Sequence, residues 1–509
     1  MRQIALAVLS VLSLSAQDAS KAWQAYEKHE RARLLPWLSE VIHFPTVAGN
    51  AQAWTDQKAW LQARAQELGF PFRDTGAVFE IELPGPEGSP VLGLVAHGDV
   101  QPVDASHWSF PPFAGTVKDG NVIGRGAADD KGPLVQALLA MKALELSGAK
   151  RTQTIRLLVG SDEESGSADM GLYLKDHKAP DYSLVLDSAF PVVAGEKAWN
   201  ALWVQTAPGE RPGRTEPYAV ESLDAGLSPS IVPDQAKLVL RWKEGAADWA
   251  PLMKRLAAKP LPPGTRLQAK PDGSHLEITT AGKSAHGGVN LEGGRNALMA
   301  LASATEHELP SGGAEDLLAF ARQAGASLYG DGLGLTEQDP LWGRVAVNVA
   351  MAGPSDRIVK LGAPEAGAWA LLINLRTPPP LFGKALETRM DAQVAAFNTR
   401  TGAKLATAGF YLDVPLAFDP QAKLIKRLMA DYTKATGEHP APAISGGGTY
   451  AKRLPHAIAF GMWFPGKPYP GHDVDEKVPV ADLERGEKVL IETLADLACS
   501  APLVEPFKP

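Results

Sequence analysis

Short apolar runs alternate with helical patterns along the first part of the chain. Apolar and acidic side chains alternate over 79–83, which predicts a half-buried strand. The run 91–96 is continuously apolar, as in a strand buried on both faces, and 155–159 and 183–186 are similar. The pattern of 134–146 is helical. This alternation predicts an α/β fold with a mixed, largely parallel sheet flanked by helices.

The pattern changes near Glu196. Beyond this residue, segments rich in proline and glycine separate strand-like runs such as 237–242. A helical pattern at 480–497 then resumes the earlier organisation. The predicted domains are 20–195 with 412–509, which form one discontinuous domain, and 196–411, which is an inserted α+β domain.

The N-terminus has the three-part layout of a secretory signal peptide. A positive charge at Arg2 precedes an apolar run over 4–14, and the small residues Ser15 and Ala16 follow. This run is too short to span a bilayer comfortably, and no later segment is long and apolar enough. We therefore expect 1–19 to be a signal peptide, the protein to be periplasmic or secreted, and the mature chain to have no membrane span. An uncleaved N-terminal anchor is the alternative.

Composition narrows the class of protein. With 509 residues, 45% of them hydrophobic and 21% charged, the chain is typical of a soluble globular protein with two domains. Its net charge of -8 argues against a nucleic-acid partner, which would favour a basic face. Cys499 is the single cysteine, so an intrachain disulfide is impossible, and a zinc ion would need mainly His, Asp and Glu ligands.

The stretch 124–132 packs two adjacent acids, Asp129 and Asp130, between glycines and ahead of a helix. Paired carboxylates in a tight turn repel each other unless a cation lies beside them. The first hypothesis is therefore a metal ion. The alternative is that one of the two acids caps the following helix, whose exposed N–H groups favour an acid. The stretch alone does not decide between them.

Other histidine and acidic residues follow the predicted strands. His97, the acidic triplet 162–164 and Asp187 each come at or just after the end of such a strand, and His472 follows a further apolar run, 457–464. In parallel sheets, ligands bind beyond the carboxyl ends of the strands. Each of these residues also has an ordinary interpretation, as a histidine at a turn, a solvated acidic loop or a turn cap.

Together these positions offer nitrogen and oxygen donors. The candidate metal ligands are His97, Asp129, Glu164, Asp187 and His472. If one carboxylate bridges, they serve two metal ions with three donors each and leave a position for a shared water. A hydrolase that activates water also needs a free carboxylate as base, and the adjacent Glu163 and Glu164 would divide the roles of base and ligand. Such a set is typical of a two-zinc hydrolase.

Seven segments resemble one family. They read AHGDV at 96–100, GRGAADDKG at 124–132, SDEESGS at 161–167, LVLDSAFPV at 184–192, GKSAHGG at 282–288, SGGGTYA at 445–451 and PGHDVDE at 470–476. In this order they resemble the two-zinc metallopeptidases that include aminoacylase, carboxypeptidase G, carnosinase and dipeptidase V. DSAFPV, NLR at 374–376 and GGGTYA most resemble the dipeptidase V, or Xaa-His dipeptidase, branch. The resemblance implies a zinc-exopeptidase-like fold in which the inserted domain is a lid.

The resemblance also assigns the ligands to two zinc ions, with Mn²⁺ or Co²⁺ as possible replacements. One zinc would be held by His97, Asp129 and Asp187, and the other by Asp129, Glu164 and His472. Asp129 would bridge the two ions, and its peptide bond to Asp130 would be cis. Asp99 would orient His97, and Glu163 would be the general base.

Further residues would bind the substrate. The resemblance implies that His286, from the inserted domain, stabilises the oxyanion, and that Arg376 binds the substrate's C-terminal carboxylate. The backbone of a glycine-rich loop would help to bind this carboxylate through Gly446, Gly447, Gly448 and Thr449. A surface charge and a simple turn are the alternatives for Arg376 and the loop. Glu476 matches an acid that often follows the last histidine, with no role assigned.

The resulting expectation is a periplasmic or secreted zinc dipeptidase that acts on small peptides with free termini. The size of the insertion predicts a monomer, because relatives with a smaller insertion borrow the lid histidine from a partner. The nearest alternative is an N-acyl amino acid deacylase or carboxypeptidase of the same family. A non-catalytic peptide-binding protein is the alternative from a different class.

Overall fold

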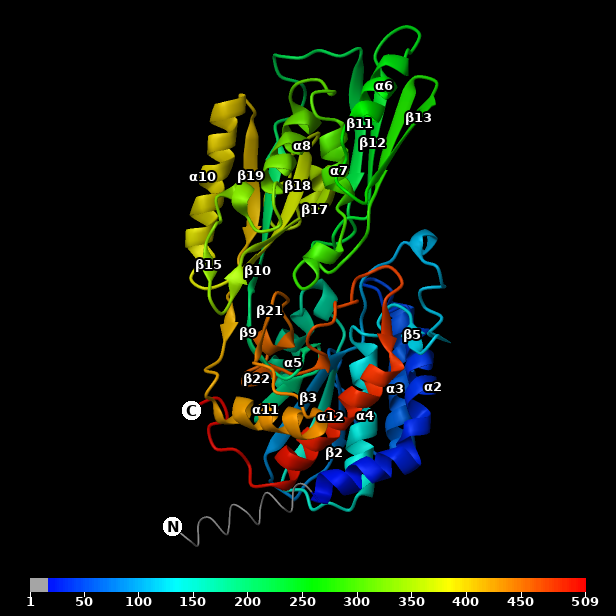
Figure 1. The fold of residues 1–509 in the computed structure, drawn as a ribbon, viewed down its shortest axis with the longest axis vertical. Coiled ribbons are helices and arrows are strands. Elements are labelled where there is room, and N and C mark those ends of the chain that lie inside the picture. The colour runs from blue at the N-terminus through cyan, green and yellow to red at the C-terminus, as the bar shows by residue number, and fades with distance from the viewer. Residues whose placement is uncertain (1–16) are drawn as a thin grey trace. The chain divides into compact units, whose positions relative to one another are not determined.

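The computed structural model describes residues 17–509, and these residues form two units (Figure 1). The first unit comprises the chain up to Glu196 together with Leu416–Gly471 and Asp475–Pro509. The second comprises Lys197–Pro415 and the short segment His472–Val474. The predicted boundaries were 195/196 and 411/412. Most of the predicted signal peptide lies outside the described residues, and a helix covers 17–25.

The first unit contains helices and mostly short strands. After the π-helix Tyr26–Glu30, its helices are α2 Arg31–Ile42, α3 Ala51–Leu68, α4 Lys131–Leu146, α5 Ala168–Asp176, α11 Lys423–Thr436 and α12 Val480–Cys499. Its strands are β1 Phe72–Asp74, β2 Phe79–Leu83, β3 Val91–His97, β4 Thr116–Lys118, β5 Asn121–Ile123, β6 Thr154–Gly160, β7 Tyr182–Val185, β8 Ser188–Ala189, β9 Val193–Glu196, β20 Leu416–Ala417, β21 Ala443–Ser445, β22 Ala457–Ala459, β23 Met462–Trp463 and β24 Lys477–Pro479.

The central sheet of the first unit has the strand order β1-β2-β6-β3-β7-β22. The strands β6, β3, β7 and β22 are mutually parallel, and β1 and β2 add antiparallel pairs at one edge. On β3, Leu94 packs into a core shared with α2, α4 and α12, whereas Val95 packs into a second cluster that includes Tyr173 of α5. Successive side chains of a strand point to opposite faces. The sheet is therefore covered on both faces, as predicted.

The second unit is built on a long antiparallel sheet. Its strands are β10 Ala198–Thr206, β11 Tyr218–Ala225, β12 Gln235–Trp242, β13 Arg266–Asp272, β14 His275–Ala281, β15 Gln338–Asp339, β16 Gly343–Arg344, β17 Ala346–Pro354, β18 Trp369–Thr377 and β19 Leu405–Tyr411. Its helices are α6 Ala250–Ala258, α7 Ala297–Ala304, α8 Gly313–Ala324, α9 Ser355–Ile358 and α10 Gly383–Thr401.

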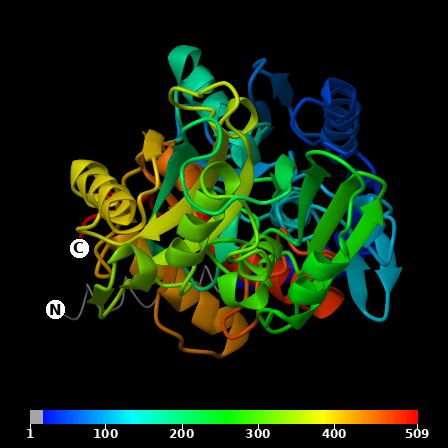
Figure 2. The same ribbon diagram turned by 90° about the horizontal axis from the view of Figure 1, so that it is seen from above.

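Eight of these strands form one sheet, in the order β13-β14-β12-β11-β17-β18-β10-β19. Figure 2 shows the strands and helices of this unit, mostly green and yellow, from above. The strand pairs within it are antiparallel, including the long pair β10 and β18. One core joins the sheet to α7, α8 and α10 through residues such as Leu298, Leu317 and Leu386. The inserted region is therefore α+β, and the predicted fold class is confirmed.

Within residues 17–509, no helix combines the length and the apolar character that crossing a membrane requires.

Glu487 is a buried carboxyl of the first unit that leads to a stability prediction. It lies on α12 with 0% exposure, and neither carboxyl oxygen has a hydrogen-bond partner among the described residues. Burial, and then the charge of Glu30, raises the pKa of Glu487 well above its usual value of 4.5. The folded state therefore keeps a proton that the unfolded chain releases, and this group's contribution to stability declines as pH rises above 4.5.

We expect Glu487→Gln to raise the melting temperature more at pH 8 than at pH 5. Glutamine has a similar volume and needs no proton to stay neutral, so the substitution removes a cost of up to about 1.4 kcal/mol per pH unit. Thermal unfolding followed by circular dichroism at the two pH values measures this difference. An equal shift at both values would contradict the assigned titration.

Candidate metal centre

Parallel strands of the first unit bring the predicted ligands to one edge of the central sheet. His97 is the last residue of β3 and is the register partner of Gly160, the last residue of β6. β7 ends two residues before Asp187, and Asp129 comes from the turn that leads into α4. The acids and the histidine that follow buried strands in the sequence therefore lie close together in the structure.

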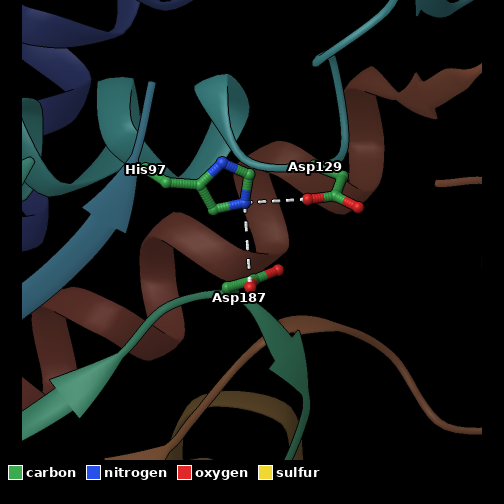
Figure 3. A group of neighbouring side chains, drawn as sticks. All are labelled: His97, Asp129 and Asp187. Carbon is green, nitrogen blue, oxygen red and sulfur yellow. Dashed lines mark hydrogen bonds and ion pairs between the residues drawn. The ribbon is translucent and has the colours of Figure 1, made fainter. Parts of the chain in front are cut away.

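His97, Asp129 and Asp187 form a group whose ligand atoms all lie within 4.8 Å of one another (Figure 3). The Nε2 atom of His97 is 3.0 Å from Oδ1 of Asp129 and 3.7 Å from Oδ2 of Asp187. Two ligand atoms of a tetrahedral zinc ion, each about 2.1 Å from the metal, lie about 3.4 Å apart. The group is therefore the right size for such an ion and offers donor types that zinc accepts.

The orientation of His97 leaves Nε2 for the ligand position. Its Nδ1 lies 2.9 Å from the backbone oxygen of Asp99, and because a carbonyl only accepts, Nδ1 donates this hydrogen bond. Burial lowers the pKa of His97, but hydrogen bonds to Asp129 and Asp99 outweigh it and hold the pKa well above its usual value. A cation beside Nε2 would replace the proton there, so metal binding and protonation of His97 compete.

The carboxylate of Asp99 contacts the acidic loop at Glu163 and Glu164 more closely than it contacts His97. Its Oδ1 is 3.5 Å from Nδ1 of His97. Its two carboxylate oxygens accept hydrogen bonds from the backbone N–H groups of Glu163, at 3.2 Å, and Glu164, at 3.0 Å. Asp99 therefore orients His97 mainly through its backbone oxygen and fixes the acidic loop with its carboxylate.

Asp130 occupies the N-cap position of α4, but its side chain makes no capping hydrogen bond. Its Oδ2 instead accepts a hydrogen bond of 3.1 Å from the backbone N–H of His97. The peptide bond between Asp129 and Asp130 is cis, as the resemblance implies. Because the carboxylate of Asp130 binds His97 and not the N-terminus of α4, the structure does not support the helix-capping interpretation of Asp130.

Several carboxyl groups lie close together around His97 and Asp129, and the pKa values of Glu163 and Asp187 are both raised. Loss of solvation raises the pKa of Glu163 well above its usual value; His97 opposes this rise, whereas Glu164 and Asp129 add to it. Burial and the charge of Asp129 likewise raise the pKa of Asp187. These groups do not all ionise easily next to one another without a compensating cation. The donor set therefore fits a divalent metal ion.

A second group that would suit a metal ion combines Asp129 with Glu164 and His472. Oε2 of Glu164 accepts a hydrogen bond of 2.8 Å from Nε2 of Gln101, which orients this carboxylate. His472 is buried and directly follows Gly471, a residue of the first unit. Asp129 is thus common to both groups.

In the second unit, His286 and Arg376 are both buried. Nδ1 of His286 accepts hydrogen bonds from the backbone N–H groups of Gly288, at 3.0 Å, and Val289, at 2.9 Å. In its neutral form this ring therefore carries its proton on Nε2.

Arg376 is only 2% exposed, which rules out a surface charge. Its Nε donates to Oδ1 of Asn374 at 2.8 Å, and Nη2 donates to Oγ of Ser230 at 3.2 Å. The guanidinium carbon lies 5.8 Å from the ring centre of Trp199. These contacts fix the plane of the guanidinium group in a polar, water-poor setting that favours binding of a carboxylate.

The glycine-rich loop is anchored at its end by Glu196. The hydroxyl and the backbone N–H of Thr449 donate to the two carboxylate oxygens of Glu196, at 2.8 and 3.1 Å. The N–H of Gly447 donates to Oγ of Ser445 at 2.9 Å. Thr449 therefore holds the loop in place, and the hydrogen-bonding groups just named are already engaged within the protein.

Three residues near the site escaped sequence reasoning. Glu476 was noted without a role, yet its carboxylate is fully buried and binds the turn that carries Asp129. Arg125, inside a recognised motif, holds this carboxylate. Tyr469 hydrogen-bonds to Asp129, and its ring occupies the space beside Gly471 that a side chain there would need. A glycine two residues after an aromatic residue was the available signal for Tyr469.

The chain is similar to known proteins over most of its length. The model of peptidase family M20/M25/M40 matches residues 93–496. "Putative dipeptidase YtjP" of Bacillus subtilis (strain 168) is 26% identical over 414 residues, which cover 81% of this chain and 84% of the relative. "Putative dipeptidase SH1171" of Staphylococcus haemolyticus is 27% identical over 444 residues, with coverage of 85% and 88%.

Solved structures show the same fold at low sequence identity. Human carnosine dipeptidase 1 has a TM-score of 0.59 at 14% identity, with 94% of this chain and 98% of that chain covered. The dipeptidase Dug1p of Saccharomyces cerevisiae has a TM-score of 0.59 at 15% identity, with the same coverage of 94% and 98%. The match of the family model spans most of the chain and includes residues from each segment of the discontinuous first unit. This chain therefore belongs to peptidase family M20/M25/M40 and is a metallopeptidase.

Proposed function

We propose that this metallopeptidase hydrolyses dipeptides with free amino and carboxyl termini and uses two zinc ions, for which Mn²⁺ or Co²⁺ would substitute. The observation that carries the proposal is the sharing of Asp129 between two donor groups, with Glu163 beside them. The relatives described as dipeptidases support the choice of substrate. When bound, the metal ions would supply Lewis acidity that polarises the scissile carbonyl and acidifies water.

Glu163 has the properties of the general base. Its carboxylate belongs to neither of the two donor groups, and the hydrogen bond from its backbone N–H to Asp99 fixes its loop. Its raised pKa brings proton uptake closer to neutral pH, where a general base is most effective. Glu163 would take a proton from the attacking water and later pass it to the leaving amine nitrogen.

We propose that residues of the second unit recognise the substrate. The protonated Nε2 of His286 would donate to the oxygen that gains negative charge in the transition state, an interaction often worth about 3 to 4 kcal/mol. Arg376 would form two hydrogen bonds with the C-terminal carboxylate of the dipeptide. In the glycine-rich loop, Gly446 and Gly448 would offer backbone N–H groups to the same carboxylate, and Thr449 would keep them in position.

The test is hydrolysis of a substrate panel by the protein before and after removal of metal. We expect free dipeptides to be cleaved, activity to disappear on dialysis against a chelator, and added Zn²⁺ to restore it. Faster release of acetate from N-acetylated amino acids than of amino acids from dipeptides would favour the deacylase instead. Zinc-loaded protein that binds dipeptides without cleaving them would favour the peptide-binding protein.

We further propose that residues 1–19 direct export, so that the enzyme acts in a periplasm or outside the cell, and that it acts as a monomer. The support is the layout of the N-terminus and the size of the insertion. N-terminal sequencing of the protein recovered from the cell envelope tests the first proposal, and light scattering tests the second. Recovery of the protein only in the cytoplasmic fraction, with residue 1 intact, would overturn the first proposal, and a stable dimer would overturn the second.

A further inference from the structure

Glu476 is the buried acid whose contacts lead furthest beyond the proposed mechanism. It belongs to the first unit, and its side chain is 0% exposed. Its Oε1 accepts hydrogen bonds from the backbone N–H groups of Ala128, at 2.9 Å, and Asp129, at 3.2 Å. One carboxylate oxygen therefore holds the two consecutive peptide groups that determine where the side chain of Asp129 points.

The other oxygen of this carboxylate is bound by Arg125. Nη1 of Arg125 donates to Oε2 of Glu476 at 2.7 Å, and this arginine is itself buried, with its guanidinium carbon 5.3 Å from the ring centre of Trp108. A buried carboxylate is costly unless it is paired and hydrogen-bonded. Arg125 supplies the compensating charge and thereby fixes the carboxylate of Glu476 against the Asp129 turn.

The backbone around Glu476 reinforces this arrangement. Its own carbonyl oxygen accepts a hydrogen bond of 2.9 Å from the N–H of Gly124. The next residue, Lys477, begins β24 and pairs with Ile123 of β5 in an antiparallel register. The segment that carries Glu476 is thus joined through its backbone to the residues that lead into the turn, and its carboxylate binds the turn itself at Ala128 and Asp129.

We propose that Glu476, held by Arg125, is a positioning residue for Asp129 and thereby sets the affinity of the centre for its metal ions. Neither side chain is assigned a contact with substrate. The inference rests on the proposed function only in taking Asp129 as a metal ligand. Groups that orient a ligand commonly change metal affinity or activity by about 10- to 100-fold when they are replaced.

The decisive variant is Glu476→Gln. Glutamine keeps the length and an oxygen that accepts from Ala128 and Asp129, but it places a neutral amide against Arg125 and removes the ionic bond that fixes it. We expect Zn²⁺ affinity, titrated into metal-free protein against a competing chelator, to fall by about 10-fold or more. The visible spectrum of the Co²⁺-substituted protein should change as well, and KM for a dipeptide should change less than kcat.

The matched control is Glu487→Gln, which also replaces a fully buried glutamate, but one on α12 whose carboxylate makes no hydrogen bond to the Asp129 turn or to any other described residue. It should leave Zn²⁺ affinity and the Co²⁺ spectrum unchanged. A Glu476→Gln protein with a lower melting temperature but wild-type zinc affinity and Co²⁺ spectrum would overturn the inference, because Glu476 would then be merely structural.

A double-mutant cycle tests the role of Arg125, and Arg125→Met by itself provides a second test if Glu476→Gln fails to fold. If Glu476 and Arg125 act as one unit, Arg125→Met should weaken Zn²⁺ binding too, and the double variant should be little worse than Glu476→Gln alone. Fully additive losses would overturn the coupling. Failure of wild-type protein to bind Zn²⁺ would instead count against the proposed function, so the two failures are distinguishable.

Discussion

Replacing Glu163 with glutamine is expected to lower kcat for a dipeptide by about 10³- to 10⁴-fold, the upper part of the range for loss of a general base. Glutamine keeps the shape of the side chain but does not accept a proton at neutral pH. Because Glu163 belongs to neither donor group, zinc content and zinc affinity should stay close to wild type. Steady-state kinetics and metal analysis of the same preparation measure both quantities.

The neighbouring acid provides the matched control for this substitution. The carboxylate of Asp162 accepts a hydrogen bond of 2.9 Å from the backbone N–H of Ala168, at the start of α5, so its role is local. Asp162→Asn should therefore retain most of the activity. An active Glu163→Gln enzyme, or equal losses in the two variants, would remove Glu163 from the role of base.

The sequence predicted that His97 and Asp187 would lie close together because each follows a buried strand. Buried parallel strands leave a clear apolar signature, and their carboxyl ends meet at one edge of the sheet. His97 and Asp187 lie at the carboxyl ends of the neighbouring parallel strands β3 and β7. Their separation in the sequence alone does not indicate that they lie close together. The part of the site that depends on strand order was therefore predictable from the order of motifs.

Contacts between distant side chains and backbone groups were not predictable in the same way. The hydrogen bonds from Glu163 and Glu164 to Asp99 involve backbone N–H groups, which every residue offers, so residue types give no hint of them. The same holds for Glu476 and the turn at Asp129. Such interactions follow from loop conformation, which apolar periodicity does not encode.

One predicted strand is different in the structure for a steric reason. The apolar run 457–464 is divided into β22, which pairs with β7, and β23, which pairs with β8. Gly461 lies between them with a φ of 68°, and a Cβ atom there would be 2.6 Å from the ring of Phe190. Continuous apolar character predicted burial of this run, but only the glycine indicated the bend.

Replacing Asp129 with asparagine is expected to have the largest effect on metal content. Asp129 belongs to both donor groups, whereas Asp187 belongs to one. A neutral amide is a much weaker ligand for a hard divalent ion than a carboxylate, so Asp129→Asn should lose most of both metal ions and about 10⁴-fold or more of kcat. Elemental analysis after dialysis against a fixed concentration of free Zn²⁺ measures the number of ions per chain.

Asp187→Asn is the comparison variant, because Asp187 belongs to one donor group and Asp129 belongs to both. It should weaken one site and leave the other, so its zinc content should lie between those of wild type and Asp129→Asn.

The stability of the metal-free protein shows separately whether Asp129→Asn still folds. The charge of Asp129 raises the pKa values of Asp187 and Glu163, so its removal relieves repulsion and should not lower the melting temperature of the metal-free protein by much. The rise in melting temperature that Zn²⁺ gives to wild type should nevertheless disappear, because it reflects binding to the folded state alone. An Asp129→Asn protein that keeps two zinc ions and this rise would show that Asp129 does not bridge the metal centre.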